Sequence, residues 1–168
     1  MTLDQLNSLD HGAFVARLGG IFEHSPWVAE RVVAQRPFAS VDALHAAMVE
    51  VVAAASNTEK LVLIRAHPQL AGKAAIRNEL TAASRSEQHG AGLDQCSADE
   101  FSRITELNDA YQQRFGFPFI LAVRGHGRDS IIANMAERLN NAPTHEHDEA
   151  LRQIARIARF RLSDLIQD

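Results

Sequence analysis

The sequence is poor in the features that mark secreted, membrane and zinc-binding proteins. Its single cysteine, Cys96, has no partner for a disulfide within the chain and is too few for a thiolate zinc site. No stretch approaches the ~20 unbroken apolar residues of a membrane span. The N-terminal residues lack the basic start and apolar core of a signal peptide. These absences favour a reducing compartment without a membrane partner, and we expect the protein to be cytoplasmic.

Positive charge is not in excess either. The 17 lysines and arginines are outnumbered by 21 aspartates and glutamates, which leaves a net charge of −4 at pH 7. Because nucleic-acid binding needs a clustered basic face, this balance argues against a nucleic-acid partner. Near the C-terminus Arg152, Arg156 and Arg159 stand at helical spacing and predict a solvated stripe. Arg161 lies between two apolar residues and is predicted to turn inward, where a buried guanidinium requires an anion nearby.

What the sequence does contain is helical patterning. Apolar residues recur at three-to-four spacing, and capping boxes at Ser56 to Glu59 and Ser97 to Glu100 mark two helix starts. With 168 residues, of which 46% are hydrophobic, the chain is long enough for one self-supporting core. We therefore predict an all-α, single-domain orthogonal bundle of about eight helices over residues 1–168.

One run, residues 117–123, resembles a strand. No second candidate exists to pair with it, so it is interpreted as a buried extended segment. The backbone N–H and C=O groups of such a segment must find partners, and they can be lent to a ligand.

Residues that carry chemistry concentrate between positions 67 and 88. Pro68 disfavours the helical conformation at the residue before it, so a helix that leads up to His67 is expected to end there, with the imidazole at a corner. Ser84 and Glu87 have the spacing of a capping box, and Gln88 falls on the same side. A helix start at Ser84 offers free N–H groups to an anion. The alternatives are an ordinary helix end at His67 and a plain capping box at Ser84.

Two other motifs point to ordinary structure. The run from Thr144 to Asp148 holds two histidines two residues apart, which face different sides of a helix, and the His-Glu-x-x-His pattern is absent. We therefore predict an exposed acidic first turn opened by Thr144 and no metal site. The glycines at 125 and 127 lack the Walker lysine and predict a tight loop, followed by a helix capped by Ser130.

Six segments, in order and spanning residues 14 to 161, together resemble a known family. They are Ser25–Glu30, Arg36–Phe38, His67–Gly72, Ser84–Gln88 with Ala91–Leu93, Leu107–Tyr111 and Phe115–Ile120. With these segments the chain resembles the 2-oxo-4-hydroxy-4-carboxy-5-ureidoimidazoline (OHCU) decarboxylases of urate breakdown. The resemblance implies an all-α homodimer that removes the carboxylate of OHCU without a cofactor and delivers (S)-allantoin.

The resemblance also implies which residues form the site. His67 is the catalytic acid/base, with Glu87 as its catalytic partner. The substrate is lined by Pro68, by Ser84, Arg85, Ser86, Glu87 and Gln88, by the backbone of Phe119, Ile120, Leu121, Ala122 and Val123, and by Arg161. The chain departs from many relatives at Gln69, where they carry an acidic residue. It also lacks the peroxisomal C-terminal signal of the animal enzymes, which implies a bacterial-type cytosolic enzyme.

Two other functions fit the same residues. One is a metal-free hydrolase or deaminase that acts on a related cyclic ureide through His67 and Glu87. The other is a non-catalytic helical protein that binds purine breakdown products. The pairing of an acid/base histidine with a carboxylate in a polar site argues against the binding protein. The hydrolase would use the same pair, and tests of hydantoin and allantoin as substrates would separate it from the decarboxylase, which we rank above both.

Overall fold

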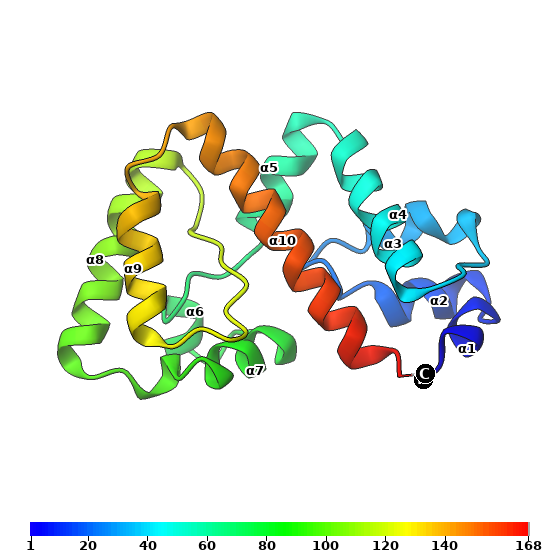
Figure 1. Ribbon diagram of the computed structural model, residues 1–168, viewed down its shortest axis with the longest axis horizontal. Coiled ribbons are helices and arrows are strands. Elements are labelled where there is room, and N and C mark those ends of the chain that lie inside the picture. The colour runs from blue at the N-terminus through cyan, green and yellow to red at the C-terminus, as the bar shows by residue number, and fades with distance from the viewer. Residues whose placement is uncertain (168) are drawn as a thin grey trace. The chain divides into compact units, whose positions relative to one another are not determined.

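Helices account for all the regular structure in residues 1–167, the part of the chain that the computed structural model describes (Figure 1). Ten α-helices and two short 3₁₀ helices follow one another without a strand in these residues. The prediction of an all-α fold is thereby confirmed. The chain divides into two compact units, one made of Met1–Ala66 with the chain from Ile154 onward, and one made of His67–Gln153. Its organisation as one domain stays a prediction.

In the first unit most α-helices begin at a residue whose side chain caps the helix. The elements before residue 66 are α1 (Leu3–Asn7), α2 (His11–Leu18), α3 (Trp27–Val32), the 3₁₀ helix η1 (Val33–Gln35), α4 (Val41–Ala54) and α5 (Asn57–Arg65). Ser40 caps α4 by accepting from the backbone N–H of Ala43. At the start of α5, Ser56 and Glu59 form the predicted capping box, which satisfies donors that the first helical turn leaves unpaired.

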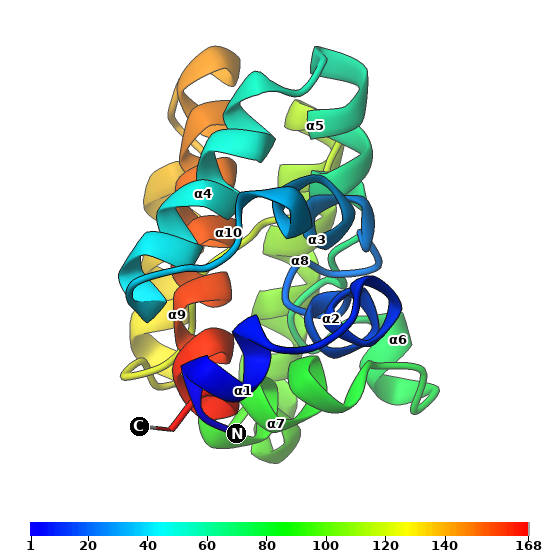
Figure 2. The same cartoon turned by 90° about the vertical axis from the view of Figure 1, so that its right-hand side faces the viewer.

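The beginning and the end of the chain meet within this first unit. The backbone N–H of Gln167 donates to the carbonyl of Met1 at 2.9 Å, and Figure 2 shows the two ends close together. The side-chain amide of Asn7 makes two hydrogen bonds with the backbone of Phe38, which attaches α1 to the turn before α4. Fully buried apolar side chains of this unit include Leu6, Phe14, Leu18, Val28, Leu44, Met48, Leu63, Ile64 and Leu162.

The second unit holds most of the predicted site. Its elements are α6 (Lys73–Ile76), α7 (Ala82–Gly90), the 3₁₀ helix η2 (Leu93–Gln95), α8 (Ala98–Phe115), α9 (Arg128–Arg138) and the first part of α10 (Pro143–Leu165), which continues into the first unit. The capping box of Ser97 and Glu100 opens α8 as predicted. At its other end Gly116 takes a left-handed conformation with φ 77°, which glycine adopts without strain.

Helices α8 and α9 run side by side in the same direction (Figure 1). Arg128 at the start of α9 pairs with Glu100 at the start of α8, with 2.8 Å between nitrogen and oxygen. Near the other end, Arg114 of α8 donates to the carbonyl of Asn141, just beyond α9. The connection between two parallel helices must return the length of a helix. Residues 118–123, which form neither helix nor strand, make this return, and we call them the return segment.

Two predicted helix starts in this unit are displaced. Ser130 is not the cap of α9, because the helix begins two residues earlier, at Arg128. The Ser130 hydroxyl instead accepts from the backbone N–H of Gly127 and lies 3.0 Å from Nδ1 of His126. Helix α10 begins at Pro143, one residue before Thr144, because proline suits a first helical position that needs no backbone donor.

Candidate active site around His67

His67 lies at the end of a helix, as the following proline predicts. Helix α5 ends at Arg65, and the N–H of Ala66 still donates to carbonyls of its last turn. The chain then leaves the helix, and the His67 side chain is buried, with 7% of its surface exposed. The structure therefore confirms the corner and places the imidazole away from bulk water.

Helix α7 carries the predicted run from Ser84 to Gln88, but it begins earlier than predicted. Its N-cap is Thr81, whose hydroxyl accepts from the N–H of Ser84. The capping box predicted for Ser84 and Glu87 is therefore wrong, because Thr81 already caps the helix and Ser84 is turned into the protein with 4% exposure. Glu87 lies in the second turn, so its carboxylate is not beside the free N–H groups of the helix start.

The five residues from Ser84 to Gln88 divide between a buried side and an exposed side of α7. Ser84 and Gln88 are one turn apart and buried, and Glu87 beside them is partly buried. Arg85 and Ser86 point to the exposed side. The structure thus brings three of the five predicted residues together on the inner face and leaves the other two on the outer one.

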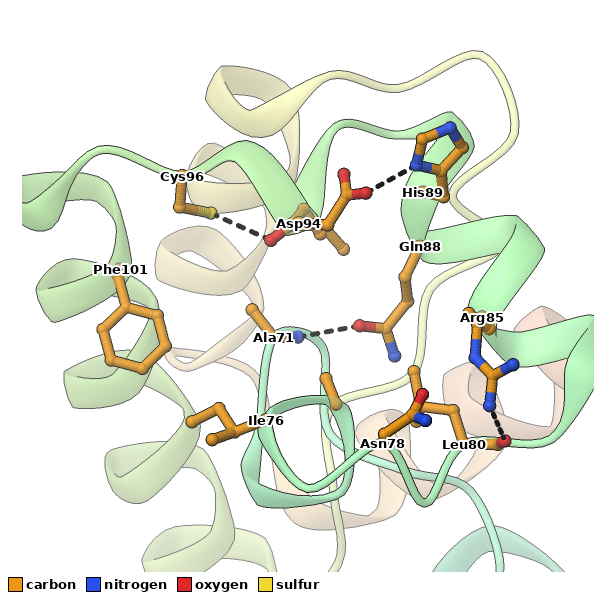
Figure 3. Close-up of a pocket in the computed structure, with 12 residues that line it drawn as sticks. Ala71, Ile76, Asn78, Leu80, Arg85, Gln88, His89, Asp94, Cys96 and Phe101 are labelled. Carbon is orange, nitrogen blue, oxygen red and sulfur yellow. Dashed lines mark hydrogen bonds and ion pairs between the residues drawn. The ribbon is translucent and has the colours of Figure 1, made fainter.

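The Gln88 side chain attaches the loop that follows His67 to α7. Its Oε1 accepts from the backbone N–H of Ala71 at 3.0 Å (Figure 3), and its Nε2 donates to the carbonyl of Gln69 at 3.4 Å. Ala71 has a φ of 49°, a left-handed conformation that costs energy for a residue with a side chain. The amide of Gln88 therefore holds a strained turn four residues after the imidazole.

Asn108 of α8 holds the same loop from another helix. Its Nδ2 donates to the carbonyl of Leu70 at 2.9 Å, and its side chain is 3% exposed. Sequence reasoning did not assign this role. The available signal was a polar residue on the face that carries Ile104, Leu107 and Tyr111, where only apolar side chains are expected without a partner.

The return segment and Phe117 just before it are buried, as predicted for residues 117–123. Its backbone finds partners in side chains of the following helices. Arg138 of α9 donates through Nη1 to the carbonyl of Ile120 at 2.7 Å, and Gln153 of α10 accepts from the N–H of Ala122 at 3.0 Å. These two partners were missed, because nothing near 120 in the sequence indicates them.

Arg138 belongs to a buried charged cluster at the start of α10. Its Nε donates to Oε1 of Glu146 at 2.9 Å, and the Tyr111 hydroxyl donates to the same oxygen at 2.6 Å. Asn141 donates to the other oxygen. Burial and the hydrogen bond to Glu146 raise the pKa of Tyr111. The predicted exposed acidic turn is wrong at Glu146, which is 0% exposed.

Arg161 lies in the other unit, on the last part of α10. It is buried as predicted, and the required anion is Glu23, at 2.8 Å with 2% of its side chain exposed. Its Nη1 also donates to the carbonyl of Gly20 at 3.2 Å. The pairing of Arg161 with a carboxylate is thus a finding, and its contact with substrate stays a prediction.

A cavity of about 500 Å³ opens beside this site and shares Arg85 and Gln88 with it (Figure 3). Its lining residues are Ala71, Ala75, Ile76, Asn78, Leu80, Arg85, Gln88, His89, Leu93, Asp94, Cys96 and Phe101. His67, Pro68 and the return segment do not line it. Phe101, one of the lining residues, is 38% exposed.

An ion pair at the cavity's edge joins the end of α7 to η2. Nδ1 of His89 lies 2.5 Å from Oδ2 of Asp94. The hydrogen bond raises the pKa of His89 above its usual value and lowers that of Asp94. The stabilisation from the raised histidine pKa is complete below the unfolded value of about 6.5 and is lost as pH rises through the folded value. On the acid side it is lost as pH falls through the lowered pKa of Asp94.

This pair gives a pH prediction. In an NMR titration the pKa of the His89 imidazole is expected above 6.5, its ordinary value. The Asp94→Asn variant is expected to return it to that value, because the partner charge is gone. Identical titration of His89 in both proteins would contradict the pairing.

Within residues 1–167, no group of three or more His, Cys, Asp or Glu side chains is arranged to hold a metal ion. In the same residues, no helix combines the length and the apolar character that crossing a membrane requires.

Comparison with known proteins identifies the family. The family model for OHCU decarboxylase matches residues 7–163. The 2-oxo-4-hydroxy-4-carboxy-5-ureidoimidazoline decarboxylase of Haloferax volcanii is 44% identical over 164 residues, which are 98% of this chain and 95% of that protein.

Two solved structures share the fold. A crystal structure of (S)-allantoin synthase matches with a TM-score of 0.81 and 32% identity over 99% of this chain and 54% of that one. A structure of OHCU decarboxylase in the presence of (S)-allantoin matches with a TM-score of 0.68 and 26% identity over 84% of this chain and 92% of that one. The segments that resembled the family in the sequence thus lie within a match over nearly the whole length, and the chain belongs to the OHCU decarboxylase family.

Proposed function

We propose that this protein decarboxylates OHCU to (S)-allantoin in urate breakdown. The observation that carries the proposal is the 44% identity to an OHCU decarboxylase over 98% of this chain and 95% of that protein. The match thus covers nearly the whole length of both proteins. The buried imidazole at the end of α5 supports the same reaction, because decarboxylation must end with delivery of a proton.

The reaction needs little more than positioning and one proton. The bond between the ring carbon and the carboxylate breaks, CO₂ leaves, and the electron pair passes to the ring carbon and the adjacent carbonyl or imine. A proton then adds to that carbon from one face. Because the ring itself accepts the electron pair, the chemistry asks for no separate electron sink. The protein must orient the carboxylate and stabilise the developing charge.

The proposed roles are those that the family resemblance implies for residues of the second unit. His67 delivers the proton, and Glu87 on the inner face of α7 holds the substrate's hydroxyl or ureido group. The substrate-binding surface also includes Ser84, Gln88 and Pro68. Peptide groups of the segment from Phe119 to Val123 face the ligand. Arg85 and Ser86, on the outer side of α7, are assigned only to the rim.

Two further properties belong to the same proposal. We infer a homodimer from the family resemblance, and light scattering of the purified protein is expected to give twice the mass of 18.5 kDa. A cytoplasmic location is supported by the single cysteine, which fits a reducing compartment.

The test is a circular dichroism assay of allantoin formed from OHCU. The unstable substrate is generated in place by urate oxidase and hydroxyisourate hydrolase, with and without this protein. A faster signal of a single sign is expected, because proton delivery from one face gives one enantiomer. Slow racemic product equal to the protein-free control would overturn the proposed function. Saturable binding of allantoin without turnover, or hydrolysis of hydantoin or allantoin, would then favour the binding or hydrolase alternatives.

Removal of the Glu87 carboxylate is expected to reduce turnover strongly. For Glu87→Ala we expect kcat/KM to fall roughly 100-fold, the order of effect of one lost charged or polar contact with the transition state. The coupled assay measures this loss. Glu79→Ala, which removes an exposed carboxylate just before the same helix, serves as the control and is expected to leave kcat/KM unchanged. A normal rate for the Glu87 variant would remove this residue from the proposed site.

A further inference from the structure

The return segment from Pro118 to Val123 is held by side chains rather than by a neighbouring strand. A buried peptide group needs a hydrogen-bond partner, and in this segment Ile120 and Ala122 find theirs in Arg138 and Gln153. The partners come from two different helices, α9 and α10. The position of the backbone here therefore depends on two specific side chains.

Arg138 is suited to fix a backbone position rather than to attract a charged ligand. Its guanidinium lies 4.4 Å from the centre of the Phe119 ring while Nη1 reaches the next residue's carbonyl. Its charge is balanced by Glu146, which is itself fully buried and held by Tyr111. The planar fork allows Nε and Nη1 to bond the carboxylate and the carbonyl at once.

We propose that Arg138 and Gln153 are positioning residues of the decarboxylation, which hold the Ile120 and Ala122 peptide groups where the neighbouring peptide groups meet the substrate. The inference rests on the proposed function, because it gives this segment its ligand. Glu146 acts one step further away by orienting Arg138. None of the three touches the reacting atoms in this assignment.

Turnover is expected to depend on these two contacts, because the peptide groups that position the substrate must be held in the orientation that the reaction requires. A displacement of about 1 Å in a group that positions substrate can lower a rate by about 100-fold. Lysine at position 138 keeps the positive charge beside Glu146, but its single ammonium cannot occupy both hydrogen-bonding positions of the fork. Methionine at position 153 keeps much of the side-chain volume and removes the acceptor for the Ala122 N–H.

The experiment compares Arg138→Lys and Gln153→Met with the matched control Arg114→Lys. Arg114 also donates to a backbone carbonyl in the same unit, that of Asn141, and its guanidinium lies over the ring of Phe115, which precedes the return segment. Two quantities are measured in each full-length protein: amide hydrogen exchange of residues 119–123 by NMR, and kcat and KM in the coupled dichroism assay. The melting temperature is recorded to follow stability separately.

In both test variants we expect faster exchange in the segment, a roughly 10- to 100-fold loss of kcat/KM and a rise in KM, with helix content unchanged. The control is expected to match the wild type in all of these. A lower melting temperature with wild-type kcat and KM in both test variants would show a structural role alone and overturn the inference, while the proposed function would stand. A wild-type protein that does not accelerate OHCU decarboxylation would overturn the proposed function and, with it, the catalytic meaning of the two contacts.

Discussion

Substitution of His67 by asparagine is expected to lower turnover of OHCU by ~10²–10⁴-fold, the range that positioned proton transfer typically contributes. Asparagine is polar and fits the end of a helix, but it cannot exchange a proton near neutral pH. The imidazole is buried at the end of α5, with 7% of its surface exposed, so solvent water is poorly placed to replace it. The coupled dichroism assay measures the loss.

A second histidine in the same unit supplies the control. His126 is half-buried and its ring lies 3.0 Å from the Ser130 hydroxyl, outside the proposed site. His126→Asn is expected to keep the wild-type kcat/KM, and both variants are expected to keep the far-ultraviolet spectrum of an all-α protein. A His67→Asn protein that turns over OHCU at a near-normal rate would end the proton-transfer role assigned to this residue.

Replacement of Glu146 by alanine is expected to cost about 3–5 kcal/mol of folding free energy, the usual result of removing one partner of a buried ion pair. The carboxylate is 0% exposed and receives hydrogen bonds from Tyr111, Arg138 and Asn141. Without it the guanidinium stays in the interior with no balancing charge. The urea midpoint of unfolding, read from the helical signal, measures the loss.

An ion pair on the surface of the same unit gives the contrast. Arg103 and Glu106 are 3.4 Å apart on α8, and 72% of the Glu106 side chain is exposed. Glu106→Ala is expected to change the unfolding free energy by less than about 0.5 kcal/mol, because solvent screens such pairs. Equal losses of unfolding free energy in the two variants would mean that Glu146 is not needed to balance the buried charge of Arg138.

The sequence predicted the features whose causes lie within a few residues. The capping boxes of Ser56 and Ser97 each need only a partner three residues on, and both are present. The end of α5 before His67 follows from the adjacent proline. Burial of the return segment followed from its apolar run and the lack of a pairing strand. Together these placed the imidazole at a corner before its surroundings were known.

The sequence predictions were wrong where contacts between residues far apart in the chain determine which side chains are buried or act as caps. Thr81 and Ser84 can each cap a helix by local spacing, and the choice between them depends on which hydroxyl is buried. Glu146 stands in a polar run that predicts exposure, yet its partner Tyr111 is 35 residues away. The anion beside Arg161 is Glu23, from the opposite end of the sequence. Local patterns contain no information about such pairings.

The bracing of the return segment also sets an order of folding. Both side chains that hold it come later in the chain, 18 residues after Ile120 and 31 residues after Ala122. On the ribosome the segment therefore emerges before either anchor exists, and the Ile120 carbonyl and the Ala122 N–H cannot make these two bonds until residues 138 and 153 have been synthesised. The backbone of residues 119–123, which is proposed to face the substrate, therefore gains its second anchor only after residue 153 has been synthesised.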